Sequence, residues 1–230
     1  MARPPPRPAA RRTNDELRIA GIVRRIASFT IYHSPNAYIG SVLLRRAAAE
    51  RPGIKIDRYP ILVPRERGVL ISEMLGGKAI ANAGSYNRED CARWADRFRI
   101  PFVYPAPDVF GDRAQRWRVA EFDREELPAR AFYAAADTGR QDTLDEALFE
   151  AAWVAGHDVN EPETILWAAE RSGLDGDSLL RKLRAETFGD EARAALAEFD
   201  RLQCPGVPTF VVDGRRYYGK DRVDWAVDDI

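Results

Sequence analysis

The chain has 230 residues, of which 45% are hydrophobic and 31% are charged, and its formal net charge is -1. A chain of this length can bury one sizeable core. Its balanced charge supplies no general field that would draw it to nucleic acid or to an anionic membrane. We therefore expect a globular protein whose partner is a small molecule, with no nucleic-acid partner and no membrane partner.

The cysteines and the apolar segments exclude further classes. Cys91 and Cys204 lie far apart in the sequence and belong to no CxxC pair or Cys/His cluster. The chain also lacks the roughly 18 consecutive apolar residues of a membrane span and an apolar run of signal-peptide length. We expect no metal, no dithiol redox centre and a cytoplasmic location, and we interpret Cys204 as a packing residue.

The N-terminal segment, residues 1–24, begins with a stretch rich in Pro, Arg and Ala. Such a composition buries too little apolar surface to repay the entropy of ordering. We predict a flexible leader.

A strand, a tight turn and a helix are predicted next. Residues 26–32 form an apolar run that ends in a His-Ser-Pro turn centred on Ser34, and apolar residues then recur at helical spacing. A Pro-Gly pair ends this helix, and residues 54–63 have strand character. Two strands joined in this way lie parallel with a right-handed crossover. The predicted fold class is α/β.

Residues 65–202 have a different, helical pattern, which predicts an inserted helical domain. Pro162 stands at a first helical position, and Asp142 precedes acidic residues that suit a first helical turn. The predicted helices span residues 88–98, 144–155, 162–172, 176–186 and 191–202.

Strand character returns near the C-terminus. Residues 208–212 and 215–218 flank Asp213-Gly214, a pair typical of a two-residue hairpin turn, and a last helix follows from Asp221. This order is that of a thioredoxin-like fold with a large helical insertion. The predicted thioredoxin-like domain comprises residues 25–64 and 203–230.

The turn after the first strand is the candidate site, because ligands of α/β sheets gather where strand ends meet helix N-termini. The Ser34 hydroxyl can cap the helix or donate a hydrogen bond to a bound thiolate. His33 is adjacent in sequence and His157 lies in the insertion, so a Ser-His-Asp triad is not supported. Both roles of Ser34 stay open, and the thiol in the second would belong to a cofactor.

The Gly-Val-Pro segment at 206–208 places proline at the start of a strand, which is an ordinary position for it. The sequence does not specify the isomer of the Val207-Pro208 peptide. A cis peptide would turn the Val207 backbone outward, where it could pair with an extended peptide-like ligand.

Four segments in chain order complete the pattern. They are Ser34-Pro35-Asn36-Ala37-Tyr38; Tyr86, Asp90 and Arg93-Trp94-Ala95 with Ile100-Pro101-Phe102; residues 147–165; and residues 206–214 with Tyr218-Gly219-Lys220-Asp221-Arg222. Together they resemble the group of 2-hydroxychromene-2-carboxylate isomerases and kappa-class glutathione transferases in the DsbA-like thioredoxin superfamily.

This resemblance implies that glutathione lies across the turn. Ser34 would be near its sulfur, Val207 and Pro208 would meet its backbone, and Asp221 with Arg222 would contact its γ-glutamyl end. An Asp can pair with the ligand ammonium and an Arg with its carboxylate. From the residues alone, Asp221-Arg222 is a solvated charge pair at a helix start.

The chain departs from the family pattern at two places. Asn36 replaces an aromatic residue, and residues 64–86 lack an Asn-Pro-Pro stretch and a lysine, at whose position Ala83 stands. Both departures affect the pocket, in which we place Asn36, Tyr38 and Tyr86. Glutathione, another thiol or no thiol therefore remain as alternatives.

The first functional hypothesis is cis/trans isomerisation of a conjugated, carbonyl-activated double bond. The substrate would be an aromatic-degradation intermediate or an unsaturated polyketide-type chain, free or carrier-bound. The alternatives are a kappa-class-like glutathione transferase and a non-catalytic thioredoxin-like binding module, whereas a disulfide oxidoreductase would need both sulfurs of a CxxC pair. The resemblance also implies a homodimer.

Overall fold

The computed structural model describes residues 23–64, 77–106, 109, 116, 123–185 and 188–230, with no side-chain description for residues 77–84 and 185. The predicted leader falls outside these ranges except for its last two residues, and Arg24 already belongs to the first strand. The departures at residues 65–76 and at Ala83 likewise fall outside the described side chains.

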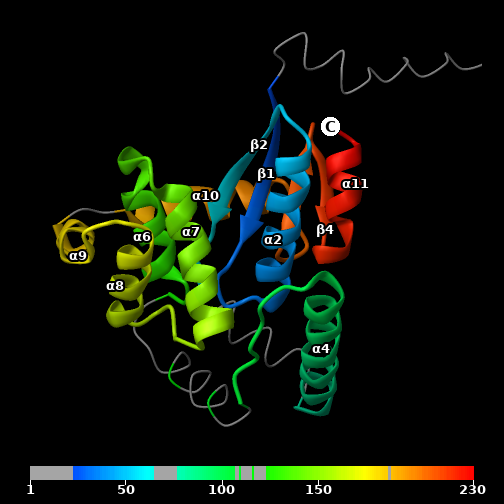
Figure 1. Cartoon of the computed structure of the whole chain (residues 1–230), viewed down its shortest axis with the longest axis horizontal. Coiled ribbons are helices and arrows are strands. Elements are labelled where there is room, and N and C mark those ends of the chain that lie inside the picture. Colours follow the sequence, from blue (N-terminus) through cyan, green and yellow to red (C-terminus); the bar gives the residue numbers. More distant parts are fainter. Residues whose placement is uncertain (1–22, 65–76, 107–108, 110–115, 117–122, 186–187) are drawn as a thin grey trace, which may run out of the picture.

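A four-stranded mixed sheet is the centre of the fold. Its strands are β1 (Arg24–Thr30), β2 (Ile54–Pro60), β3 (Thr209–Val212) and β4 (Arg215–Tyr218), in the spatial order β2-β1-β3-β4. β1 pairs with β2 in parallel and with β3 antiparallel, and β3 pairs antiparallel with β4. The chain thus has the predicted α/β class and the predicted thioredoxin-like fold (Figure 1).

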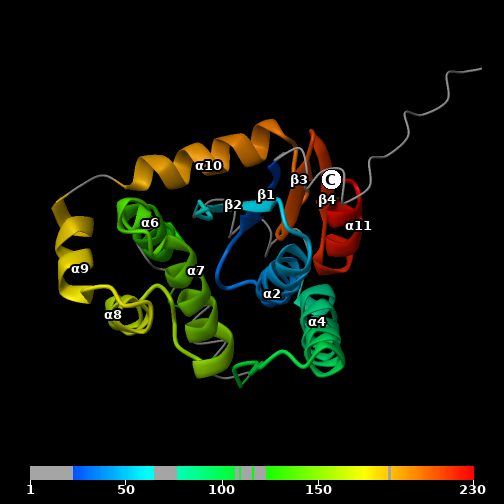
Figure 2. The same ribbon diagram turned by 45° about the horizontal axis from the view of Figure 1, so that its top comes forward.

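Alternating side chains direct the two faces of the sheet to different helices. On one face Ile26, Phe210 and Val212 pack against α2 (Pro35–Glu50) and α11 (Val223–Asp228). On the other face Phe29 and Val211 pack against α10 (Gly189–Arg201). Figure 2 shows α10 on the side of the sheet opposite to α2. Because successive strand residues point to opposite faces, the four consecutive buried residues of β3 can serve two cores.

The remaining helices gather beside β2 and beside the start of α2 (Figures 1 and 2). α4 contacts α2, and the others form a helical group next to the sheet. They are α4 (Gly77–Phe98), α6 (Glu126–Ala134), the 3-10 helix η1 (Ala136–Thr138), α7 (Gln141–Glu150), the π-helical turn η2 (Ala151–Ala155), α8 (Pro162–Arg171) and α9 (Gly176–Ala185). A 3-10 turn, η3 (Lys220–Arg222), precedes α11.

Several predicted boundaries need correction. β1 ends at Thr30 and not at residue 32, α4 begins at Gly77 and not at residue 88, and α6 was not predicted. The proline in the first turn of α6 disguises that helix, since proline is tolerated only there. The predicted helix 144–155 is an α-helix followed by a π-helical turn.

Of the predicted helix caps and turns, one needs correction and two are confirmed. Asp142 does not cap α7, because Arg140 is the N-cap residue and Asp142 instead accepts a hydrogen bond from Arg58 at 2.6 Å. The proline start of α8 is confirmed, with Pro162 in its first helical position. Asp213 and Gly214 both have positive φ, 47° and 78°, as the predicted two-residue hairpin turn requires.

Candidate functional site

Ser34 caps the helix that follows β1. Its Oγ accepts a hydrogen bond from the backbone N–H of Ala37 at 3.1 Å, with Pro35 in the first turn of α2. A hydroxyl has two acceptor lone pairs and one O–H donor. Capping occupies one lone pair and leaves the proton of the half-buried hydroxyl for a ligand.

The turn before Ser34 is held by a carboxylate from the helical insertion. Glu125 is fully buried, and its two carboxylate oxygens accept hydrogen bonds from the backbone N–H groups of Tyr32 at 2.8 Å and His33 at 3.1 Å. The backbone N–H of Glu125, which has a left-handed φ of 67°, donates to Asn160 Oδ1 at 3.0 Å. The sequence analysis missed Glu125, since nothing in its local pattern signals burial against a partner 92 residues away.

The imidazole of His33 points into the same insertion. Its Nδ1 contacts Glu125, and its Nε2 lies 3.2 Å from Asp158 Oδ1. Burial disfavours the charged Glu125 carboxylate, but the attraction of His33 and Arg124 outweighs it and lowers the Glu125 pKa. Glu125 therefore stays ionised in the core, and both nitrogens of His33 face carboxylates of the insertion.

Tyr32 provides a second link between the turn and the insertion. Its carbonyl accepts from the indole N–H of Trp153 at 2.7 Å, and its hydroxyl donates to Asp145 Oδ1 at 3.0 Å. Asp145 also accepts from Arg58 Nε at 3.0 Å. Burial raises the pKa of Asp145, while Arg58 and Arg45 oppose that rise.

The Val207-Pro208 loop lies against the helix that Ser34 caps. The peptide between these residues is cis, and the Pro208 carbonyl accepts from the backbone N–H of Gly219 at 2.9 Å. A Cβ atom at Gly40 of α2 would lie 3.1 Å from Pro208 Cγ. Glycine at this position thus permits the close approach of the loop to α2.

Asp221 and Arg222 are partly exposed at the start of η3 and α11. Arg222 Nη1 donates to Asp221 Oδ2 at 2.8 Å, and the guanidinium lies 4.6 Å from the centre of the Trp225 ring. This contact matches the solvated charge pair that the residues alone suggest. Binding of a γ-glutamyl group by Asp221 and Arg222 stays a prediction.

The three predicted pocket residues occupy different environments. Asn36 Nδ2 donates to Asn87 Oδ1 at 2.7 Å, whereas Tyr86 is 63% exposed on α4. Tyr38 lies in the core, where its hydroxyl donates to the Pro101 carbonyl at 2.7 Å and burial raises its pKa to about 12. A shared substrate pocket for these side chains stays a prediction.

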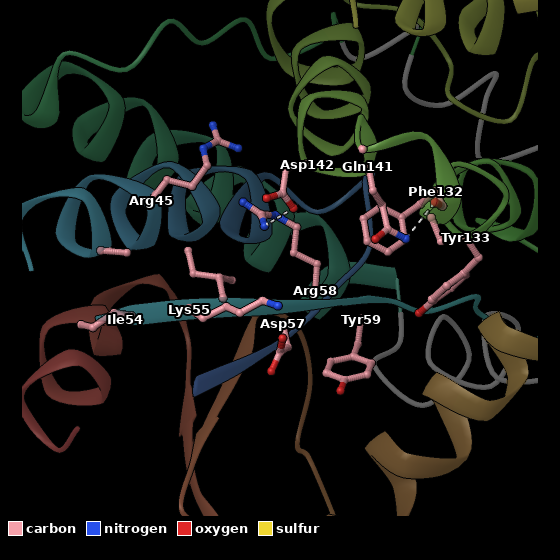
Figure 3. A pocket seen from close by; sticks show the side chains of 14 residues that line it. Arg45, Ile54, Lys55, Asp57, Arg58, Tyr59, Phe132, Tyr133, Gln141 and Asp142 are labelled. Carbon is pink, nitrogen blue, oxygen red and sulfur yellow. Dashed lines mark hydrogen bonds and ion pairs between the residues drawn. The ribbon is translucent and has the colours of Figure 1, made fainter. Parts of the chain in front are cut away.

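A separate groove follows β2 on the side of the insertion (Figure 3). Its volume is about 680 Å³, and its lining contains none of the predicted site residues. Arg58 points from β2 toward Asp142 of α7, and Asp57 and Tyr59 point to the other side of the strand (Figure 3).

Metal clusters and membrane spans are absent from the part of the chain that the structure describes. There, no group of three or more His, Cys, Asp or Glu side chains is arranged to hold a metal ion. Among the same residues, no helix has the length and apolar character needed to cross a bilayer.

Known proteins resemble this chain in sequence and in structure. The 2-hydroxychromene-2-carboxylate isomerase of Sphingobium xenophagum is 28% identical over 203 residues, which are 84% of this chain and 90% of that protein. Glutathione S-transferase kappa 1 of Rattus norvegicus is 25% identical over 155 residues, 63% of this chain and 65% of that protein. A solved structure of a 2-hydroxychromene-2-carboxylate isomerase superposes with a TM-score of 0.71 at 18% identity, over 89% of this chain and 93% of that one.

A family model also matches most of the chain. The model of the DSBA-like thioredoxin domain matches residues 25–230. This range includes the helices on both faces of the sheet and all four strands, except for Arg24, the first residue of β1. This chain belongs to the family of DSBA-like thioredoxin domains.

Proposed function

We propose that this chain catalyses cis/trans isomerisation of a conjugated, carbonyl-activated double bond with glutathione as the thiol. The observation that carries the proposal is the Ser34 hydroxyl, which caps α2 with one lone pair and has an O–H donor besides. The Val207-Pro208 loop packs against the same helix at Gly40. The similarity to a 2-hydroxychromene-2-carboxylate isomerase over 84% of the chain supports this reaction type.

The donors around the turn fit glutathione chemically. The N-terminus of α2 presents the positive end of a helix dipole, which favours a thiolate. Asp221 and Arg222 are within reach of solvent and offer the charges that complement an ammonium and a carboxylate. The similarity to kappa-class transferases supports the choice of this thiol.

When bound, glutathione would supply a thiolate for reversible addition to the double bond, and this addition would permit rotation about that bond. The residues of this chain would bind glutathione and orient it. Ser34 donates a hydrogen bond to the sulfur, Val207 and Pro208 hold the tripeptide backbone, and Asp221 with Arg222 hold its γ-glutamyl end. The electron pairs return to their starting positions, so no oxidant or reductant is consumed.

The substrate, assembly and location extend the proposal. We propose a small-molecule or carrier-bound conjugated carbonyl compound, such as an unsaturated polyketide-type chain, with Asn36, Tyr38 and Tyr86 near its pocket. We also propose a homodimer in the cytoplasm with no nucleic-acid or membrane partner, in keeping with the near-zero net charge.

The second candidate is glutathione transfer, which is favoured by the matches to kappa-class transferases from rat and human at 25% and 24% identity. The same residues would bind the thiol. The two reactions differ in product, because transfer leaves a stable thioether and isomerisation regenerates free glutathione. Product analysis by mass spectrometry distinguishes them.

Calorimetric titration with glutathione tests the binding site. We expect a Kd in the micromolar to millimolar range for the wild type, and at least about a 10-fold weaker affinity for Asp221→Ala, since a charge-assisted hydrogen bond is lost. Asp224→Ala, which removes an exposed carboxylate from α11, is the matched control and should bind like the wild type. An absence of binding to the wild type would overturn glutathione use and leave another thiol, a thiol-free isomerase or a binding module.

Three substitutions at Ser34 separate its capping role from its role in turnover. Ser34→Ala should cost about 1 kcal/mol of stability and at least about 10-fold in turnover. Ser34→Asp restores the cap but not the O–H donor, so stability should return and turnover should not; Ser34→Thr should restore both. If turnover changes in parallel with stability in all three variants, Ser34 acts only as a helix cap.

A further inference from the structure

Lys220 is a buried cation in the loop that faces α2. Its residue is 7% exposed, and its ammonium donates to Asp90 Oδ2 of α4 at 2.5 Å and to Asn36 Oδ1 of α2 at 2.6 Å. The Trp94 ring centre lies 5.4 Å from the same nitrogen. The sequence analysis named Lys220 only as part of a motif and gave it no role.

The direction of the side chain brings its charge to the N-terminus of α2. The Cα atom of Lys220 lies 3.5 Å from the position of a Cβ at Gly40, and the ammonium reaches Asn36, one turn nearer to Ser34. A cation beside a helix N-terminus is unfavourable, because the helix dipole is positive there. The carboxylate of Asp90 offsets this cost. The ion pair with Asp90 thus holds the Lys220 ammonium near the positive end of the helix dipole.

We infer that Lys220 is a positioning residue of the Ser34 site, which adds its positive charge to the end of α2 to stabilise a thiolate at Ser34, and that Asp90 moderates this charge. The inference rests on the proposed function in that the thiolate would be that of glutathione. Lys220 acts through space and through Asn36, and no contact with the ligand is required of it.

Cys91 is a thiol close to Lys220 and Asn36. Its surroundings show that it is not the thiolate that Lys220 stabilises. Its Sγ lies 3.6 Å from Asn36 Oδ1 and 3.6 Å from Asn87 Oδ1. Burial raises the pKa of Cys91 to about 11, although the charge of Lys220 acts in the opposite direction. Cys91 therefore stays protonated, and the charge of Lys220 does not serve to ionise it.

The thiol pKa of a Ser34→Cys variant measures the effect of the Lys220 charge without any ligand. In a Ser34→Cys background, Lys220→Met removes the positive charge and should raise the pKa of the new thiol by about 0.5, while Asp90→Asn removes the opposing charge and should lower it by about 0.5. Thiolate absorbance or the alkylation rate is measured against pH. A merely structural role of the ion pair gives both variants a change in the same direction.

The surroundings supply both a constant background and a matched control. His33, Glu125, Asp158, Asp221 and Arg222 are unchanged in all of these variants. The charges of Lys220 and Asp90 also act on Cys91, so the same Lys220→Met and Asp90→Asn variants with Ser34 retained correct for the signals of Cys91 and Cys204. Lys182 of α9 and Asp137 of η1 form an ion pair of the same chemistry at 3.1 Å, and α9 lies far from α2 in Figure 1. Lys182→Met and Asp137→Asn should leave the pKa at position 34 unchanged.

The outcomes separate this inference from the proposed function. Opposite shifts support the inference even when the wild type binds no glutathione, in which case the proposed function alone is wrong. Shifts of the same sign, or none, overturn the inference even when glutathione binds. If Lys220→Met does not fold, Asp90→Asn still decides the matter, because only the electrostatic role predicts a lower pKa for it.

Discussion

At the scale of single residues, Glu125 organises the turn that presents Ser34. One carboxylate receives two backbone N–H groups and the Nδ1 of His33 from a segment that lies 92 and 93 residues away in sequence. An ionised carboxylate in the core is tolerated because each oxygen has a partner and a cation is adjacent. The position of Ser34 thus depends on a side chain of the insertion.

Glu125→Gln tests this dependence. The amide is nearly the same size but carries no charge, and its NH₂ group cannot accept from a backbone N–H, so we expect a loss of about 3 kcal/mol in the free energy of unfolding. Urea denaturation measures it. Glu126→Gln is the control, since its carboxylate lies 3.8 Å from Arg130 and 4.0 Å from Arg193 on the half-exposed side of α6, and it should lose less than about 1 kcal/mol. Equal losses would contradict the role of Glu125.

At the scale of elements, the contact between α2 and the Pro208 loop defines the candidate site. A Cβ atom added at Gly40 would lie only 3.1 Å from Pro208 Cγ and 3.2 Å from Phe210 Cζ. Alanine at an ordinary helical position would stabilise α2 by roughly 0.5–1 kcal/mol. At position 40 the added methyl group must instead displace the loop.

Gly40→Ala should therefore lower both the stability of the fold and its affinity for glutathione, because overpacking costs about 1–3 kcal/mol and moves Pro208 away from α2. Gly214→Ala is the control at the hairpin. Its φ is 78° and its surroundings are open, so the strain is confined to the turn. This variant should lose about 1 kcal/mol of stability and keep its affinity. Thermal unfolding and calorimetry would refute the prediction if the two variants bound glutathione equally well.

At the scale of the whole molecule, charged side chains are buried where the insertion meets the sheet. Glu125 and Asp145 both come from the insertion, and both reach the segment that follows β1. Their pKa values move in opposite directions, since His33 lowers that of Glu125 against the effect of burial, while burial raises that of Asp145. The two groups therefore make opposite contributions to stability in acid.

The pH dependence of unfolding follows from these signs. Glu125 contributes stability above its ordinary pKa of 4.5, and that contribution is lost as the pH falls through its lower value in the folded protein. Asp145 takes up a proton more readily when folded, so its burial cost is relieved as the pH falls. Between about pH 5 and pH 3 the stability of the wild type should fall. The fall should be shallower for Glu125→Gln and steeper for Asp145→Asn, and identical slopes would contradict the assignment.

Local patterns in the sequence determined most of the elements. The apolar run of β1, the Asp213-Gly214 turn and the proline start of α8 each depend on neighbouring residues, so their conformations follow from side-chain periodicity and backbone preference. The segments around Ser34 and Val207-Pro208 predicted the family in a different way, through their resemblance to the motifs of that family. Helix α6 was missed because Pro128 interrupts a short pattern.

Only the tertiary structure decided which distant charges meet. Glu125 lies 92 residues from His33 in the sequence, and Asp145 lies 113 residues from Tyr32. Lys220 is separated from Asn36 by 184 residues and from Asp90 by 130. No periodicity records such pairs, because an acidic or basic residue on a helix has the same sequence signature whether it faces solvent or a buried partner. The sequence determined the fold and the turn that holds Ser34, and the packing of the insertion and of α4 onto that turn determined its electrostatic surroundings.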